Sequence, residues 1–261
     1  GEGAEERDAV LTWPEGNAWL SRRLAAPLGP RLHTGMLGLR VAESRHQVEV
    51  DFWNAAEQRT ERWTAPKAVL AVPLFIAARL LTSPPAALVD AVGRMRHAPW
   101  LVANLHLSAP VADRGGAAPA WDNVFYDDPT LGYVDAGHQS LLPYPGPTVL
   151  TAYWALGGAS AAELAAQRAR LLGEPWSGWA EAVIRPLAAV HPDLRDKLQR
   201  IDLARYGHAM SIPVPGLRSS AALAALAAPQ PRVQFAHSDL SAYSTFEEAL
   251  YQGERAARAA L

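Results

Sequence analysis

The spacing of apolar residues changes several times along the chain, and each change marks a predicted element. Apolar residues recur at helical spacing over residues 15–28, which predicts a helix that Pro30 closes. Three short stretches follow, in which apolar and polar residues alternate or β-favouring residues are enriched between polar breaks. They predict a small antiparallel sheet with strands at 36–42, 47–53 and 61–65.

A different pattern begins at residues 67–73, where apolar residues run almost without interruption up to a proline. Such a run is typical of a strand buried on both faces, and it predicts a parallel or mixed sheet. Helical spacing follows over residues 74–97, broken by a Ser-Pro-Pro sequence. Strands of a second sheet are predicted at 101–107 and 148–156, with a loop rich in Ala, Gly and Pro at 109–120 between them.

Two helices are predicted after the second sheet. Ser160 and Glu163 form a capping box, in which a hydroxyl and a carboxylate satisfy amide donors at the start of a helix. Gly173 ends that helix. The other helix covers residues 179–190 and stops at the sequence His191-Pro192.

The last part of the chain places a strand, a loop and a helix in close succession. Residues 233–236 are a short apolar run after a proline, which predicts a buried strand. A loop containing Asp239 follows, and Ser244 with Glu247 makes a second capping box, so a helix is predicted from Thr245. Small residues recur on one side of that helix, which allows another element to approach closely: Ala249, Gly253, Ala256 and Ala260.

Together these elements predict an α+β fold with two lobes. Residues 1–75 and 205–261 are assigned to one lobe, which is therefore discontinuous in the sequence. Residues 76–204 are assigned to the other lobe, which contains the second sheet and its helices.

Composition excludes several classes of protein. The 261 residues are 49% apolar, which is enough for a sizeable core, and the net charge of -2 is spread along the chain, so neither nucleic acid nor an anionic membrane is expected as a partner. No apolar run is long enough to cross a bilayer, and the charged first ten residues are unlike a signal peptide. The absence of cysteine excludes disulfides, thiolate metal sites and a cysteine nucleophile, and it leaves cytoplasm and periplasm both open.

Other catalytic signatures are missing as well. The eight histidines form no HxH or HExxH pattern, so no metal site is expected, and no GxSxG sequence supports a serine hydrolase. Asp127 and Asp128 are adjacent, and neighbouring residues of a strand point to opposite faces, so a turn is a better interpretation of this pair than a hydrolytic carboxylate pair.

The C-terminal strand, loop and helix have the chemistry of a ligand site. A helix whose amino end faces the carboxyl end of a strand presents free amides and a favourable dipole to an electron-rich group. A carboxylate such as that of Asp239 would bind hydroxyl groups, because it would repel phosphate. A ligand with hydroxyls and an electron-accepting ring suits both features.

At these residues the chain resembles the flavin-containing amine oxidase and phytoene-desaturase-like oxidoreductases. The resemblance is carried by Phe235-Ala236, the acid that follows, the tyrosine-containing loop and the Gly-Glu-Arg-Ala-Ala sequence at 253–257. Three other segments are similar to that family, at 12–25, 64–73 and 205–216. The resemblance implies an FAD-binding domain formed by 1–75 and 205–261, a substrate domain at 76–204, and hydride transfer from a C–N or C–H bond of a small-molecule substrate to flavin.

The resemblance also implies roles for single residues. Asp239 is expected to contact the ribityl chain, with Ser238 as the competing assignment, and the amides of Thr245 and Phe246, beside Ser244, are expected to face the flavin ring. Val72 and Pro73 would line the cofactor, and Tyr206 and His208 would face the substrate. The plainer alternatives are a loop-capping aspartate, an ordinary capped helix, a buried aromatic residue and a hydrogen-bonded histidine.

One motif of that family is missing from this sequence. Its members begin with GxGxxG at a strand–turn–helix, where the helix amino end binds pyrophosphate, and no GxGxxG occurs here. The resemblance therefore implies a partner, a dinucleotide-binding half that is a separate chain or segment, and FAD held without a covalent bond. The alternative is a non-catalytic subunit that keeps the fold. Without its partner the chain is expected to expose sheet edges and to aggregate.

Overall fold

The computed structural model describes residues 13, 15–113, 115, 120–139 and 146–261, so the first ten residues lie outside the described part. The chain folds as two compact units. Unit 1 comprises residues 1–29 and 99–207, and unit 2 comprises residues 30–98 and 208–261. The predicted lobes had different limits, and their assignment to cofactor and substrate stays a prediction.

Unit 2 contains two sheets. The strands β1 (Met36–Glu43), β2 (Val48–Asn54) and β3 (Arg59–Ala65) form the predicted antiparallel sheet. Asp51 lies between Arg40 and Arg62, and its carboxylate accepts hydrogen bonds from both guanidinium groups at 2.7 Å. These cross-strand ion pairs lower the pKa of Asp51 to about 2, and they fix the register of the three strands.

The second sheet of unit 2 is a parallel pair. β4 (Ala68–Leu70) runs beside β10 (Val233–Phe235), with Val69 opposite Gln234. β10 is buried throughout, whereas Val69 is 39% exposed. The expected parallel strand is therefore present, but it is shorter than predicted, and the prediction that it is buried on both faces is wrong.

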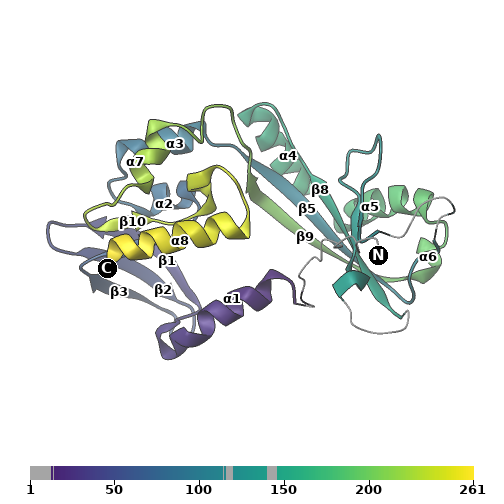
Figure 1. Ribbon diagram of the computed structural model, residues 1–261, viewed down its shortest axis with the longest axis horizontal. Helices are drawn as coiled ribbons and strands as arrows, with labels where there is room; N and C mark the ends of the chain where they lie inside the picture. The colour runs from purple at the N-terminus through teal and green to yellow at the C-terminus, as the bar shows by residue number, and fades with distance from the viewer. Residues whose placement is uncertain (1–12, 14, 114, 116–119, 140–145) are drawn as a thin grey trace, which may run out of the picture. The chain divides into compact units, whose positions relative to one another are not determined.

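The helices of unit 2 surround this parallel pair. α8 (Phe246–Ala260) packs along β10 and β4, while α3 (Ala86–Arg94) packs on α7 (Ala221–Ala227), as Figure 1 shows. α2 (Leu74–Leu80) and the short 3-10 helix η3 (Ser238–Ser241) complete the unit. A continuous apolar core links the helices to both sheets, with Leu74, Leu88 and Leu223 among its most buried members.

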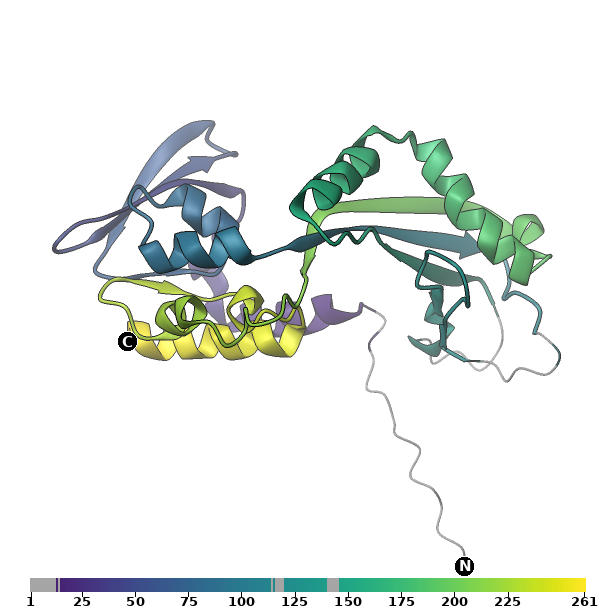
Figure 2. The same ribbon diagram turned by 90° about the horizontal axis from the view of Figure 1, so that it is seen from above.

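Unit 1 is built on a five-stranded sheet in the order β6-β7-β8-β5-β9. Buried and half-buried residues alternate along β5, and Leu101 and Leu105 lie on its buried face. The helices α4 (Ala161–Gly173) and α5 (Trp176–Val190) cover that face (Figure 2), and Trp179 of α5 is completely enclosed there. The strands are β5 (His97–Leu107), β6 (Asp122–Asn123), β7 (Tyr133–Asp135), β8 (Thr148–Ala155) and β9 (Leu198–Ser211).

The remaining helices are α1 (Asn17–Ala25), η1 (Ala26–Arg31), η2 (Ala136–Gln139), α4 (Ala161–Gly173), α5 (Trp176–Val190) and α6 (Leu194–Lys197). The capping box at α4 is confirmed, since Ser160 Oγ accepts the amide of Glu163 at 3.2 Å and the Glu163 carboxylate accepts the amide of Ala159 at 2.7 Å. The 14-residue strand β9 was not predicted, because its residues show no clear alternation of apolar and polar positions.

The second predicted capping box is displaced by one residue. The N-cap of α8 is Thr245, whose hydroxyl accepts the amide of Glu248 at 3.4 Å. Ser244 instead accepts the amide of Ser211 at 2.8 Å, which ties the start of α8 to the end of β9. The helix thus begins at Phe246, and the prediction that Ser244 and Glu247 cap it is wrong.

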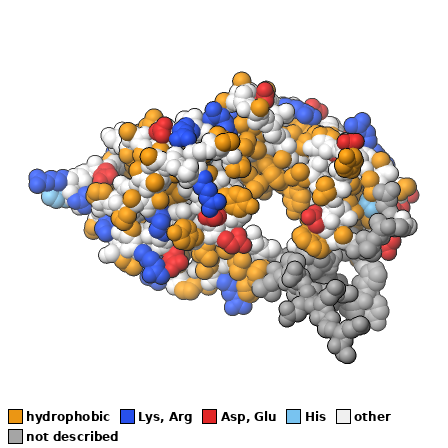
Figure 3. All heavy atoms as spheres, turned by 45° about the horizontal axis from the view of Figure 1, so that its top comes forward, with side chains coloured by type: hydrophobic (Ala, Val, Ile, Leu, Met, Phe, Trp, Pro, Cys, Tyr) orange, Lys and Arg blue, Asp and Glu red, His pale blue; other side chains and the backbone are white. Residues whose placement is uncertain are grey.

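The surface agrees with the balanced composition. On the described part of the face drawn in Figure 3, Lys and Arg side chains lie scattered among apolar and acidic ones and form no single basic patch. Among the described residues, no helix combines the length and the apolar character that crossing a bilayer requires.

Candidate functional site

The first candidate site lies where the two parallel strands of unit 2 end. β4 leads through residues 71–73 into α2, and β10 leads through Ala236 and His237 into η3 and the start of α8. Because the strands are parallel, their carboxyl ends lie at the same edge, which is where open α/β sheets bind ligands. We call residues 71–74 and 236–246 the carboxyl-end corner.

Asp239 is the centre of the corner, and the protein encloses it. Its side chain is 1% exposed, and one carboxylate oxygen accepts the amide of Leu74 at 2.9 Å. The other oxygen lies 3.0 Å from Nε2 of His97. Pro73, the N-cap of α2, has no side-chain hydrogen bond to offer, so Asp239 satisfies the first amide of that helix from a distant part of the chain.

The electrostatics of Asp239 follow from these contacts. Burial alone would raise the pKa of its carboxyl group, but hydrogen bonds with His237 and His97 outweigh burial and hold the pKa well below its usual range. Asp239 is therefore ionised at neutral pH. Its charge is balanced by imidazole groups and a helix amino end, as a buried carboxylate requires.

Aromatic rings extend the corner. Phe75 of α2 lies edge-on to His97 with ring centroids 5.2 Å apart, and it lies 4.9 Å from the ring of His208. His208 is exposed, and it belongs to unit 2. Tyr206, predicted with it for the substrate side, is 52% exposed and belongs to unit 1.

The predicted cofactor residues are brought together at this corner, but several of their polar groups are already bonded. Ser238 is buried, and the hydroxyls of Ser244 and Thr245 accept backbone amides. The amide of Thr245 donates to the carbonyl of Tyr243 at 3.2 Å. Phe246, at the first turn of α8, is half-buried, and Val72 and Pro73 are also partly exposed to solvent.

Sequence reasoning missed three members of the corner: Phe75, His97 and His237. His97 lies 142 residues before its partner Asp239, so no local pattern connects them. His237 carries a usable signal, because it follows directly on a predicted buried strand. Polar residues at that position lie at the ligand-binding edge of a parallel sheet.

The side of α8 with small residues is only partly covered. Ala256 is fully buried, but Ala249 is exposed, and a Cβ atom added to Gly253 would meet nothing within 4 Å. Close packing of Gly253 within the described part of the chain is therefore not observed. Arg255 instead binds α8 to the unit, since it donates to the carbonyl of Phe235 at 2.5 Å and to that of Ala227 at the end of α7.

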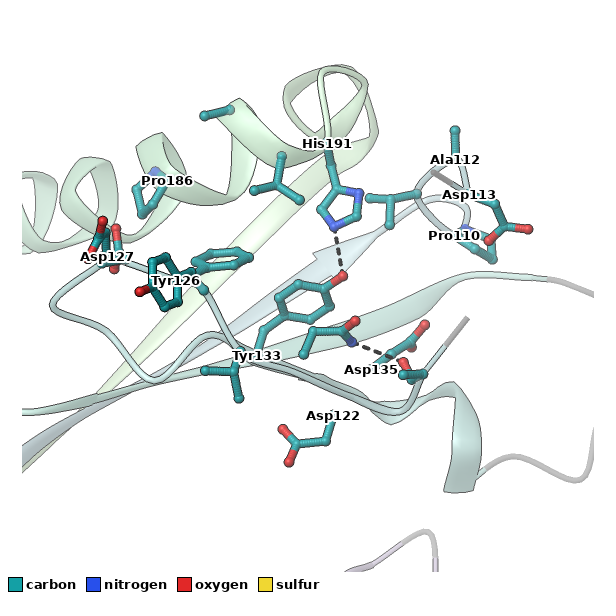
Figure 4. A pocket seen from close by; sticks show the side chains of 18 residues that line it. Pro110, Ala112, Asp113, Asp122, Tyr126, Asp127, Tyr133, Asp135, Pro186 and His191 are labelled. Carbon is teal, nitrogen blue, oxygen red and sulfur yellow. Dashed lines mark hydrogen bonds between the residues drawn. The ribbon is translucent and has the colours of Figure 1, made fainter. Parts of the chain in front are cut away.

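A second candidate site is a pocket of about 650 Å³ in unit 1 (Figure 4). Five aspartates and no lysine or arginine line it among the described residues: Asp113, Asp122, Asp127, Asp128 and Asp135. The rings of Phe125, Tyr126 and Tyr133 also line it. Carboxylates and aromatic faces together suit an organic cation.

One feature of this pocket, the conformation of Asp127, tests a prediction from the sequence. Asp127 has a φ of 57° and lies in a turn, so the prediction of a turn at Asp127 and Asp128 is confirmed. On the buried wall of the pocket, the hydroxyl of Tyr133 lies 2.7 Å from Nε2 of His191 (Figure 4). Within the described residues, no group of three or more His, Asp or Glu side chains has the arrangement of a metal site.

Comparisons with known proteins identify the class of fold. Solved structures of amine oxidases share it. A cyclohexylamine oxidase from Brevibacterium oxydans IH-35A is 17% identical with a TM-score of 0.67, and the match covers 94% of this chain and 52% of that chain. A putrescine oxidase bound to putrescine is 14% identical with a TM-score of 0.67 and the same coverage. The chain thus spans about half the length of these structures.

The family model for flavin containing amine oxidoreductases matches residues 3–261. The chain therefore belongs to this family, which confirms the resemblance and the fold class. FAD is the flavin of this family, as predicted, and this sequence has no cysteine that could link it covalently. Comparison with curated proteins finds no match.

The corner can be compared with the needs of a flavin. The amino end of α8 and the half-buried surfaces of Val72, Pro73 and Phe246 suit a planar ring with an electron-rich edge. The carboxylate of Asp239, in contrast, has no surface left for a hydroxyl group. The backbone and apolar groups of the corner therefore fit a flavin, and the Asp239 carboxylate does not.

Proposed function

We propose that this chain works as one half of an FAD-dependent amine oxidoreductase, together with a dinucleotide-binding GxGxxG half in a separate chain or segment. The observation that carries the proposal is the family match over residues 3–261. In this proposal the corner holds the ring and ribityl portion of the flavin, and FAD, when bound, accepts a hydride from a C–N or C–H bond of a small-molecule substrate.

The residues of this chain would supply binding and orientation. The first amides of α8 would lie against the ring edge where negative charge develops on reduction. Val72, Pro73 and Phe75 would exclude water from the ring, and Tyr206 and His208 would face the substrate. Exclusion of water and fixed orientation matter more for hydride transfer than an acid–base pair.

The parallel pair of unit 2 supports the existence of a partner strand. Ala68 and Leu70 use their backbone groups to bond β10, so the N–H and C=O of Val69 point away from it and make no hydrogen bond to a described residue. A buried parallel sheet has few such edges. The opposite edge is covered, because Arg255 caps the carbonyl of Phe235. A strand of the partner would therefore pair with β4.

Co-purification with the GxGxxG half tests the function. The complex should be yellow, release FAD on denaturation and bleach when a primary amine is added without oxygen. A complex that contains no FAD would contradict the proposal. Val69→Lys should weaken the assembly, because a lysine at the free edge opposes pairing with another strand. Val89→Lys, on the exposed side of α3, is the matched control and should assemble normally.

The second candidate function is a non-catalytic subunit that keeps the fold. One observation favours it: the polar groups of Asp239, Ser244 and Thr245 are bonded within the protein. A stable, colourless complex with the partner would support this function.

A further inference from the structure

The polar surface of the carboxyl-end corner is unevenly distributed. Residues 238–242 are all buried, as is Ala236 before them. His237 is the exception in this stretch, with 27% of its side chain exposed. It is therefore the side chain from the end of β10 that a ligand at this edge of the sheet can reach.

The orientation of the His237 ring is fixed on one side. Its Nδ1 atom lies 3.1 Å from the amide of Asp239, which donates to it, and 3.3 Å from the Asp239 carboxylate. Among the described residues, Nε2 of His237 makes no hydrogen bond. Asp239 thus holds one edge of the imidazole and leaves the other edge available.

Nε2 of His237 carries a proton whether the imidazole ring is neutral or charged. When Nδ1 accepts the amide of Asp239, the proton of the neutral ring is on Nε2. When the ring is protonated, both nitrogens carry a proton, and Nδ1 can donate to the carboxylate instead. Nε2 is a hydrogen-bond donor in either state, so it suits an oxygen acceptor of a ligand.

We propose that His237 donates the corner's side-chain hydrogen bond to an oxygen of the flavin nucleotide, and that Asp239 is a positioning residue that orients His237. This proposal rests on the proposed function, because it requires a flavin at the corner. In this proposal His237 contacts the flavin nucleotide in place of Asp239, which was expected to contact the ribityl chain. The acceptor is a ribityl hydroxyl oxygen or a phosphate oxygen.

The experiment uses the complex of this chain with its GxGxxG half, freed of flavin and titrated with FAD. His237→Ala should raise the Kd for FAD roughly tenfold, the effect of one lost hydrogen bond. His237→Gln, which keeps an N–H near the position of Nε2, should recover most of the affinity. His46→Ala removes an exposed histidine of the β1–β2 turn and should leave the Kd unchanged.

A double-mutant cycle separates the roles of the two residues. Asp239→Asn should weaken FAD binding in the wild-type background and have little further effect when His237 is already Ala. An equal effect of Asp239→Asn in both backgrounds would overturn the proposal, since it would show direct contact by Asp239. If Asp239→Asn does not fold, an unchanged Kd for His237→Ala still overturns it.

Two further outcomes have distinct meanings. If the wild-type complex binds no FAD, the proposed function fails and this inference fails with it. If the wild type binds FAD and His237→Ala binds it equally well, only the inference fails. Titration with riboflavin locates the acceptor, because an equal loss of riboflavin affinity identifies the ribityl portion and a loss confined to FAD identifies a phosphate.

Discussion

The carboxylate of Asp239 in unit 2 and the aspartates of the pocket in unit 1 differ in their exposure to solvent. Asp239 is enclosed by the protein, and two imidazole rings and the amino end of a helix stabilise its negative charge. In the pocket, Asp113, Asp122 and Asp127 are exposed. The difference shows that a carboxylate close to a ligand-binding edge does not have to contact the ligand. A buried carboxylate bonds groups of the protein, whereas an exposed one can also bond a ligand.

The largest effect is expected from removing the buried carboxylate. Asp239→Ala should lower the free energy of unfolding of unit 2 by about 3–5 kcal/mol, because it removes the buried charge that bonds His97 and the acceptor of the Leu74 amide. Urea denaturation followed by tryptophan fluorescence measures this. The matched control is Asp202→Ala, which breaks the exposed His106–Asp202 contact and should change stability little.

The same carboxylate predicts an acid-dependent loss of stability. The pKa of Asp239 is lower in the folded state than its ordinary value of 3.8. Its contribution is therefore complete above about pH 4 and is lost progressively as the pH falls towards the folded-state pKa. Thermal unfolding between pH 6 and 2 should show a steeper decline for the wild type than for Asp239→Ala. If the melting temperatures of the two proteins fall equally with pH, Asp239 is not the group that causes the acid-dependent loss of stability.

Unit 1 offers a neutral counterpart of the Asp239 cluster. Tyr133→Phe removes the hydroxyl that bonds His191 and should destabilise unit 1 by about 1–2 kcal/mol, less than the loss of a buried charge. Tyr126→Phe is the control, because Tyr126 is 95% exposed, and it should have no effect. A loss as large as that of Asp239→Ala would remove the contrast between the two regions.

The sequence predicted the parts of the fold that depend on local patterns. The capping residues of α4, the antiparallel strands of unit 2 and the presence of the short apolar strands β4 and β10 all follow from spacing and turn chemistry. The pairing of β4 with β10 was not predicted, because the two strands lie far apart in the sequence. The partners of Asp239 could not be predicted, because Leu74 and His97 lie 165 and 142 residues away and only the folded chain brings them together.

The predicted role of the small residues on α8 shows another limit. Glycine at position 253 indicated close packing, yet a Cβ atom there would meet nothing within the described chain. Gly253→Ala should therefore stabilise the isolated chain by about 0.5–1 kcal/mol, the usual gain in an open helix position. Differential scanning calorimetry measures this smallest effect. Destabilisation would show that the position is already crowded.

The most direct test of the account is a crystal structure of the chain bound to its GxGxxG half and FAD. We expect a third parallel strand along the Val69 edge of β4, with the flavin at the carboxyl-end corner and Nε2 of His237 within hydrogen-bond distance of one of its oxygens. A structure in which the flavin lies elsewhere, or in which the partner leaves the β4 edge open, would contradict the account.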